Sequence, residues 1–136
     1  MGPGAEGTEP VYLEFVDALE LYAAIIAGST RQAADQLRGQ AGLESALGRP
    51  RNYAQYEEAG LALQAAALAH SIAESQAFID GNKRLALVAM LTFLEVNDYS
   101  VEATDPELAE WILGLSAGTT PDALAESLRS QLRPIR

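Results

Sequence analysis

The stretch that decides the fold reads Gln76-Ala77-Phe78-Ile79-Asp80-Gly81-Asn82-Lys83-Arg84 and runs directly into Leu85-Ala86-Leu87-Val88-Ala89-Met90-Leu91. A polar loop here becomes an apolar helix, with Asp80 expected as its N-cap and Gly81 permitting close approach of a ligand. Asn82, Lys83 and Arg84 place polar and cationic groups on the first exposed N–H groups of that helix. Because a helix N-terminus carries partial positive charge, this pattern predicts a phosphate-binding site. A carboxylate beside such a site can hold Mg²⁺.

These residues resemble the signature of the Doc branch of the Fic/Doc family, His-x-Phe-x-Asp-(Ala/Gly)-Asn-Lys-Arg. The chain matches that signature at every specified position except the first, where Gln76 stands in place of the family's catalytic histidine. The flanking segments 42–50 and 91–99 resemble the family as well, so the likeness covers most of residues 11–132. Without this resemblance, residues 80–84 would be interpreted as an ordinary capped helix start with two solvated cations. With it, the phosphate site is the favoured interpretation.

The resemblance implies ATP and Mg²⁺ as cofactors and a role for each residue of the motif. It implies that Asp80 holds Mg²⁺ and takes part in catalysis. It assigns contacts with the phosphates to Gly81, Asn82, Lys83 and Arg84. Phe78 is expected to be a packing anchor for the loop.

Gln76 is the exception, because the family histidine accepts a proton from the target hydroxyl. A carboxamide does not titrate near neutral pH and cannot act as a general base, although it can still form hydrogen bonds. Three explanations remain open: an engineered inactivating substitution, a natural pseudoenzyme, or an enzyme that uses another base. We favour the first two, since glutamine approximates the size and hydrogen bonding of histidine. His70 is a candidate replacement base, but a lone histidine in an alanine-rich helix is usually structural.

The family resemblance implies a Doc-like toxin of a type II toxin–antitoxin system. Such a protein is in ancestry a kinase that transfers the γ-phosphate of ATP to a threonine of elongation factor Tu and arrests translation. A Phd-like antitoxin is the expected partner, and the chain as written is expected to be catalytically impaired. One alternative is a Fic-type AMP transferase, disfavoured because Fic proteins prefer Gly-Asn-Gly-Arg where this chain has Gly81-Asn82-Lys83-Arg84. Another is a non-catalytic binding module of the same fold.

Composition limits the other possibilities. At 136 residues the chain is long enough for one hydrophobic core and too short for two. The absence of cysteine excludes disulfides and zinc–thiolate sites and fits a cytoplasmic location, and the single histidine excludes a multi-histidine metal site. A net charge of −10 argues against direct DNA binding. The apolar run at 85–96 is too short to span a bilayer, so no membrane association is expected.

Apolar periodicity, glycine and proline give the expected order of elements. We expect helices at 14–27, 43–47, 57–75, 81–97, 105–115 and from Thr120 to about 132, with a short helix or ordered loop at 30–41. The polar segment 51–56 should be an exposed connection. No stretch alternates for long enough to make a sheet. The sequence therefore predicts an all-α fold: a flexible tail at 1–10, then a single domain at 11–136 that forms a compact helical bundle around a central buried helix at about 81–97.

Overall fold

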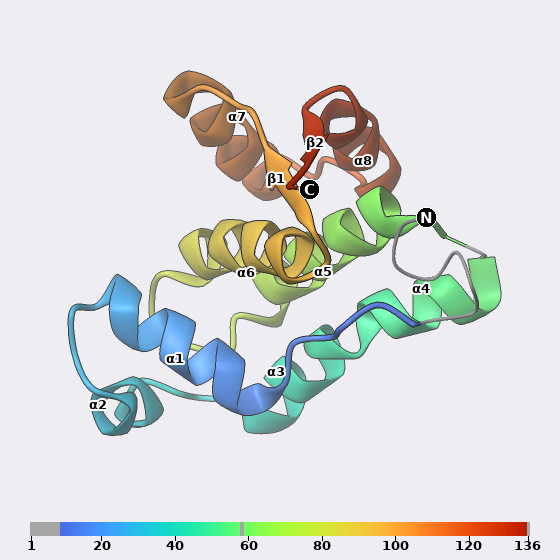
Figure 1. The fold of residues 1–136 in the computed structure, drawn as a ribbon. Helices are drawn as coiled ribbons and strands as arrows, with labels where there is room; N and C mark the ends of the chain where they lie inside the picture. Colours follow the sequence, from blue (N-terminus) through green and yellow to red (C-terminus); the bar gives the residue numbers. More distant parts are fainter. Residues whose placement is uncertain (1–8, 58, 136) are drawn as a thin grey trace.

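The computed structural model describes residues 9–57 and 59–135, and the fold is almost entirely helical (Figure 1). The elements in chain order are α1 (Phe15–Ile25), α2 (Thr30–Asp35), α3 (Gln40–Leu47), α4 (Arg49–Glu57), α5 (Leu61–Ser75), α6 (Asn82–Val96), β1 (Tyr99–Val101), α7 (Asp105–Ser116), α8 (Pro121–Arg129) and β2 (Leu132–Pro134). The predicted all-α bundle is confirmed. Most of the predicted tail at 1–10 lies outside the described residues. No helix in the described ranges is both long and apolar enough to cross a membrane.

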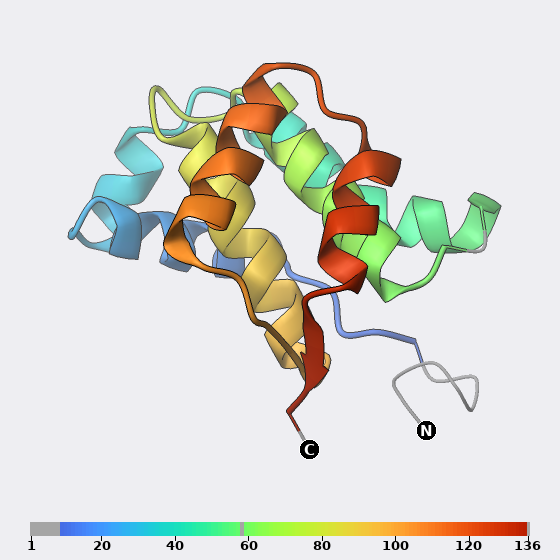
Figure 2. The same cartoon turned by 90° about the horizontal axis from the view of Figure 1, so that it is seen from above.

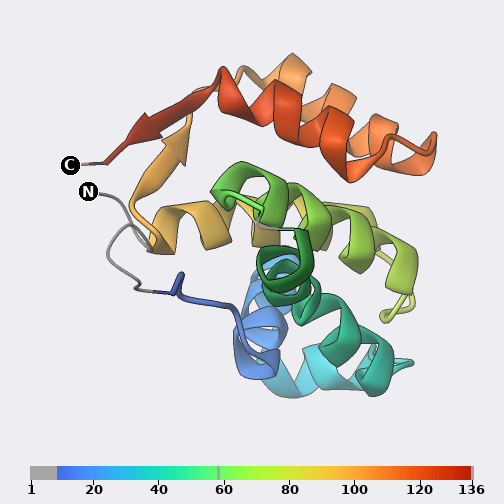
Figure 3. The ribbon, with the colours of Figure 1, turned by 90° about the vertical axis from the view of Figure 1, so that its right-hand side faces the viewer.

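The helices form three layers. Helices α5 and α6 lie side by side in the middle, α1 to α4 cover one face of this pair, and α7 and α8 cover the other (Figure 3). Seen from above, α7 lies over α6 and α8 lies over α5 (Figure 2). The middle pair therefore forms the centre of the bundle.

The predicted central helix α6 shares that centre with α5. Helix α5 packs against α3, α4, α6, α7 and α8, whereas α6 packs against α1, α5, α7 and β1. The alanine-rich sequence of α5 explains this position, because small side chains at Ala65, Ala66 and Ala69 are buried and let neighbouring helices approach closely. Residues 76–81, which belong to the motif, connect these two central helices.

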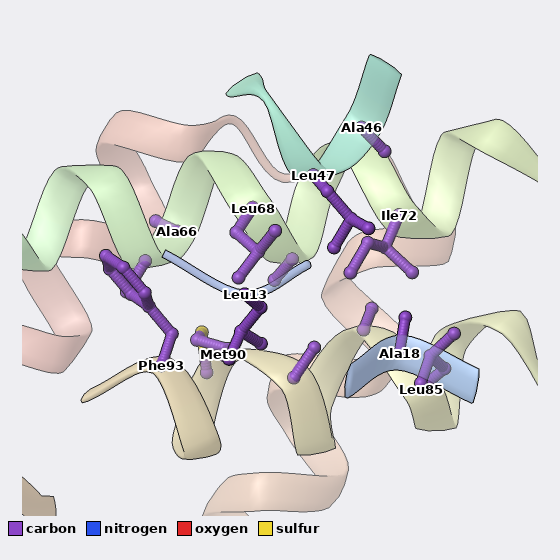
Figure 4. Close-up of a cluster of buried hydrophobic side chains, with 14 of the residues drawn as sticks. Leu13, Ala18, Ala46, Leu47, Ala66, Leu68, Ile72, Leu85, Met90 and Phe93 are labelled. Carbon is purple, nitrogen blue, oxygen red and sulfur yellow. The ribbon is translucent and has the colours of Figure 1, made fainter. Parts of the chain in front are cut away.

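The core lies mainly between α5 and α6, and Leu13, Ala18 and Leu47, from the N-terminal segment, α1 and α3, are part of it (Figure 4). Phe93 of α6 is 0% exposed and stacks on Tyr12 with ring centroids 5.8 Å apart. Leu91, two residues earlier, is only partly buried at the edge of the core. Phe93 is therefore the stronger of the two core positions.

The segment expected to be an exposed connection at 51–56 is part of helix α4, so the predicted connection was wrong, although Arg51, Asn52 and Gln55 are exposed. Pro50 lies in the first turn of this helix, where a missing N–H group costs no hydrogen bond, and its side chain is buried. The guanidinium of Arg51 lies 4.4 Å from the ring centroid of Tyr12, a cation–π contact that attaches α4 to the N-terminal segment. Tertiary contacts thus stabilise a helix whose own sequence lacks an apolar stripe.

The prediction that no sheet forms was also wrong, because β1 and β2 pair as an antiparallel two-stranded ribbon. Tyr99 pairs with Pro134, and Val101 pairs with Leu132. Each strand has three residues, which is too short for alternation to appear in the sequence. The last helix accordingly ends at Arg129, before the predicted limit near residue 132.

Candidate functional site

The residues of the motif form the loop between α5 and α6 and the first turn of α6. Gln76 is the C-cap of α5 and has a left-handed backbone with φ of 45°. Gly81 is the N-cap of α6 with φ of 79°, a conformation that favours glycine. The predicted N-cap, Asp80, was therefore wrong by one residue: its carboxylate accepts the Gly81 N–H at 2.7 Å from outside the helix. The positive φ required at the helix entry selects glycine for the capping position.

The loop is fixed to the segment before α3 by backbone hydrogen bonds. Leu37 and Phe78 form an isolated antiparallel bridge. The Arg38 N–H donates to the Ala77 carbonyl at 2.6 Å, and the Ile79 N–H donates to the Gln36 carbonyl at 3.0 Å. Residues 77–79 therefore behave as a short extended piece that is held from one side.

Phe78 fastens the same loop from within the core. Its side chain is 0% exposed, and its ring stacks on Tyr22 of α1 with centroids 3.8 Å apart and planes at 10°. The Tyr22 hydroxyl donates to the Asp80 carbonyl at 2.8 Å. Tyr22 thus joins α1 to the loop at two points, Phe78 and Asp80, as a loop anchor requires.

Asn82 connects the helix start back to the loop. Its side chain accepts a hydrogen bond from the Phe78 N–H at 3.0 Å and donates one to the Phe78 carbonyl at 2.9 Å. Both ends of this carboxamide are therefore engaged within the loop. Its predicted contact with phosphate oxygens stays a prediction.

Lys83 and Arg84 are exposed on the first turn of α6. Within the described residues neither cation has a carboxylate partner within 4.0 Å. No side chain caps the N–H groups at this end of the helix. Uncapped N–H groups, the positive end of the helix dipole and two unpaired cations together form an electropositive surface that suits an anion.

This surface borders a pocket of about 930 Å³, large enough for a nucleotide. The sequence-predicted residues that line it are Gln76, Asp80, Gly81, Asn82, Lys83 and Arg84. Phe78 lies beneath the loop and does not line it. The structure thus brings the polar part of the motif to one cavity.

The rest of the lining was missed by sequence reasoning. It comes from the end of α1 and the turn after it, from α2, α5 and α7, and from the loop itself: Tyr22, Ile25, Ile26, Ala27, Gly28, Gln32, Asp35, Gln36, Ala73, Ile79 and Ile112. The sequence offered one signal for this part of the lining. Residues 30–35, which form α2, are polar, lack an apolar stripe and directly follow the Gly28-Ser29 turn. Ala27 has φ of 53°, so strained backbone borders the pocket at both Ala27 and Gln76.

His70 does not line the pocket. Its Nδ1 atom lies 3.4 Å from the Glu74 carboxylate, one turn further along α5. This contact is a local helix pair. A replacement of the missing base at position 76 by His70 is therefore not supported by its position.

Tyr22 is a pocket residue whose pKa departs from its ordinary value. Burial of its hydroxyl raises the pKa of Tyr22 above 10.0, and the nearby Asp80 carboxylate raises it further. The side chain is therefore a neutral hydrogen-bond donor throughout the physiological range.

The donor set of the pocket fits Mg²⁺ held together with phosphates. The described residues contain no cluster of three or more His, Cys, Asp or Glu side chains that would make an all-protein metal cage. The exposed carboxylate of Asp80 lies beside the electropositive surface, and a second exposed carboxylate, that of Asp35, lines the same pocket. Mg²⁺ is commonly held by one or two carboxylates, phosphate oxygens and water, so this arrangement suits it.

Comparisons with known proteins identify the family of the chain. The curated proteins give no match. The family model of the Fic/DOC family matches residues 12–94, which include α1, the segment before α3, the motif loop and most of α6. The chain therefore belongs to the Fic/DOC family.

Proposed function

We propose that this protein is a Doc-like toxin of a type II toxin–antitoxin system that binds ATP with Mg²⁺ in the pocket beside the loop that connects α5 and α6. The observation that carries the proposal is the uncapped, doubly cationic start of α6 at the edge of a pocket of about 930 Å³. Phosphoryl transfer depends largely on positioning and on electrostatic stabilisation of phosphate oxygens. The start of α6 would supply both.

Each residue of the pocket has a role in this proposal. Lys83 and Arg84 would hold phosphate oxygens by charge-assisted hydrogen bonds, and Gly81 leaves room for close backbone approach. Asp80 would hold Mg²⁺, which when bound neutralises phosphate charge. Family membership supports a transferase of the kinase or AMP-transferase kind. Lys83, at the position where Fic proteins prefer glycine, favours γ-phosphate transfer.

The chemistry of Gln76 makes the protein catalytically impaired in this proposal. Its side chain is exposed at the pocket, where a general base would be needed, and it cannot accept a proton near neutral pH. Its left-handed backbone is one that histidine adopts more readily than most residues. A histidine at position 76 would therefore fit the same backbone.

The partners in this proposal are a Phd-like antitoxin and, as phosphate acceptor, elongation factor Tu. Family membership supports an antitoxin, and the net charge of −10 favours a basic or mixed segment over an acidic one. An antitoxin segment that folds on binding would cover apolar surface between helices.

Nucleotide binding is tested by calorimetry with ATP and Mg²⁺. Lys83→Ala should weaken binding, since a charge-assisted contact contributes on the order of 1.5–3 kcal/mol. Arg133→Ala is the matched control, because it removes one exposed cation from β2, outside the pocket. Equal affinity in the parent, Lys83→Ala and Arg133→Ala would exclude the phosphate-site proposal.

Lys83 is also the only lysine of the chain. A lysine-reactive acyl phosphate of ATP should therefore label one side chain besides the N-terminal amine. Competition by excess ATP should prevent labelling of Lys83 and leave the N-terminal amine unprotected. If excess ATP reduced labelling equally at both amines, the reagent would report general amine reactivity and not a nucleotide site at Lys83.

The transfer reaction is tested by Gln76→His. The restored base should increase phosphate transfer to elongation factor Tu by roughly 10²–10⁴-fold and should halt growth when expressed, with rescue by the antitoxin. Label in the γ-phosphate detects kinase activity, and label in the α-phosphate detects AMP transfer. A variant that binds ATP yet transfers neither label would favour the non-catalytic binding module.

A further inference from the structure

Tyr22 makes three contacts with the motif loop although it lies on α1, 58 residues earlier in the chain than Asp80. Its ring stacks on Phe78, and its hydroxyl donates to the Asp80 carbonyl. A Cβ atom at position 81 would lie 3.4 Å from Cε1 of Tyr22, so the ring also packs against Gly81. With 2% of its surface exposed, Tyr22 borders the pocket from within the core.

The hydroxyl contact fixes the orientation of one peptide group. In a planar trans peptide the carbonyl and the N–H group point in opposite directions. Holding the Asp80 carbonyl toward Tyr22 therefore turns the Gly81 N–H away from Tyr22. On that side the Asp80 carboxylate accepts the same N–H at 2.7 Å.

We propose that Tyr22 is a positioning residue that sets the affinity of the pocket for ATP and Mg²⁺ by holding the Asp80–Gly81 peptide in one orientation. The inference rests on the proposed function of the pocket and adds a residue that the motif does not contain. Loss of the hydroxyl would free the peptide to rotate. Rotation would move the Asp80 carboxylate and the N–H groups at the start of α6 together.

A general stabilising role is the competing explanation, and the chain contains a close control for it. Tyr12 also stacks on a phenylalanine, Phe93, and its hydroxyl also donates one hydrogen bond, to Gln64 at 2.9 Å. Tyr12 does not line the pocket. Tyr22→Phe and Tyr12→Phe therefore each delete one hydroxyl and one hydrogen bond, but only Tyr22→Phe does so at the site.

Titration with ATP and Mg²⁺ should show about three- to ten-fold weaker binding for Tyr22→Phe, the effect of one lost hydrogen bond, and unchanged binding for Tyr12→Phe. Both variants should lower the melting temperature by similar amounts. The inference is overturned if Tyr22→Phe binds as tightly as the parent, or if Tyr12→Phe weakens binding equally.

A second measurement needs no nucleotide. The amide of Gly81, observed by NMR, should change its chemical shift and exchange faster with solvent in Tyr22→Phe, and it should be unchanged in Tyr12→Phe. An unchanged Gly81 amide in Tyr22→Phe would contradict the positioning role. A parent protein that does not bind ATP would instead exclude the proposed function, and the amide measurement would still decide the role of Tyr22.

Discussion

The side-chain carboxamide of Asn82 and the backbone of Phe78 form a reciprocal pair of hydrogen bonds, at 3.0 Å from the Phe78 N–H and 2.9 Å to the Phe78 carbonyl. The pair joins the first residue of α6 to the buried aromatic of the loop. It closes the short loop that contains Asp80 and Gly81. The same asparagine that the motif predicts at a phosphate site is therefore also a structural brace.

Asn82→Ala should reduce both stability and nucleotide affinity. It leaves the partly buried Phe78 N–H without its acceptor, which costs roughly 1–3 kcal/mol. Urea denaturation measures the first effect, and calorimetry with ATP and Mg²⁺ measures the second. Asn52→Ala, on the exposed surface of α4, is the control and should alter neither. An unchanged denaturation midpoint in Asn82→Ala would show that the loop is held without this pair.

Gln76→Gly should leave the protein at least as stable as the parent. Gln76 has φ of 45°, and a left-handed backbone costs a residue with a side chain roughly 1–2 kcal/mol. Glycine adopts this backbone freely, although it loses about 0.5–1 kcal/mol through the entropy of the unfolded chain. The net change measured by urea denaturation should lie between zero and about 1.5 kcal/mol of stabilisation.

Ala73→Gly supplies the comparison, because this residue lies within α5 at ordinary helical geometry. It should destabilise the protein by about 1 kcal/mol. If both glycine variants are destabilised alike, the strain attributed to position 76 does not exist in solution.

The start of α6 could be predicted from the sequence because its signals are local. Gly81, the two cations and the long apolar run all lie within a few turns of one another. The cap was misplaced because a positive φ selects Gly81 over the better side-chain acceptor Asp80. Residue preference alone does not reveal that φ.

The rest of the site depends on contacts between distant segments. Tyr22 reaches the loop only because α1 packs against α6, and no spacing in the sequence connects residue 22 with residue 80. The pairing of Tyr99 with Pro134 is equally remote from local pattern. Helix α4 was missed for a related reason, since its polar residues are held by contacts such as that of Arg51 with Tyr12. Tertiary packing decided each of these features.

Phe93→Ala should destabilise the protein by roughly 3–5 kcal/mol, as expected for truncation of a fully buried aromatic residue. Leu91→Ala should cost less than the 2–5 kcal/mol typical of a buried leucine, because Leu91 is only partly buried. Both changes replace a side chain of the same helix by alanine, the best helix former, so neither loses helix propensity. Thermal or urea denaturation measures which of the two substitutions lowers the free energy of unfolding more. Leu91→Ala as the costlier change would mean that the core lies on a different face of α6.

The final prediction concerns stability at alkaline pH. Burial raises the pKa of both Tyr12 and Tyr22 above 10.0 in the folded protein, whereas in the unfolded chain both ionise near 10.0. Below that pH both states keep the protons, and the two tyrosines add no pH dependence. As pH rises above about 10, the unfolded chain loses protons that the folded protein keeps, so the free energy of unfolding falls. The fall ends once the pH exceeds the folded pKa of each tyrosine.

Urea denaturation at about pH 8 and about pH 11 should therefore show a loss of stability in the parent that is smaller in Tyr22→Phe and smaller still when Tyr12→Phe is added. Phenolate absorbance gives a direct check: the parent should release fewer protons at a given alkaline pH when folded than when unfolded in urea. Phenylalanine cannot ionise at either position, so each substitution removes one of the two contributions. If the double variant loses as much stability as the parent over this range, the alkaline sensitivity arises from other groups.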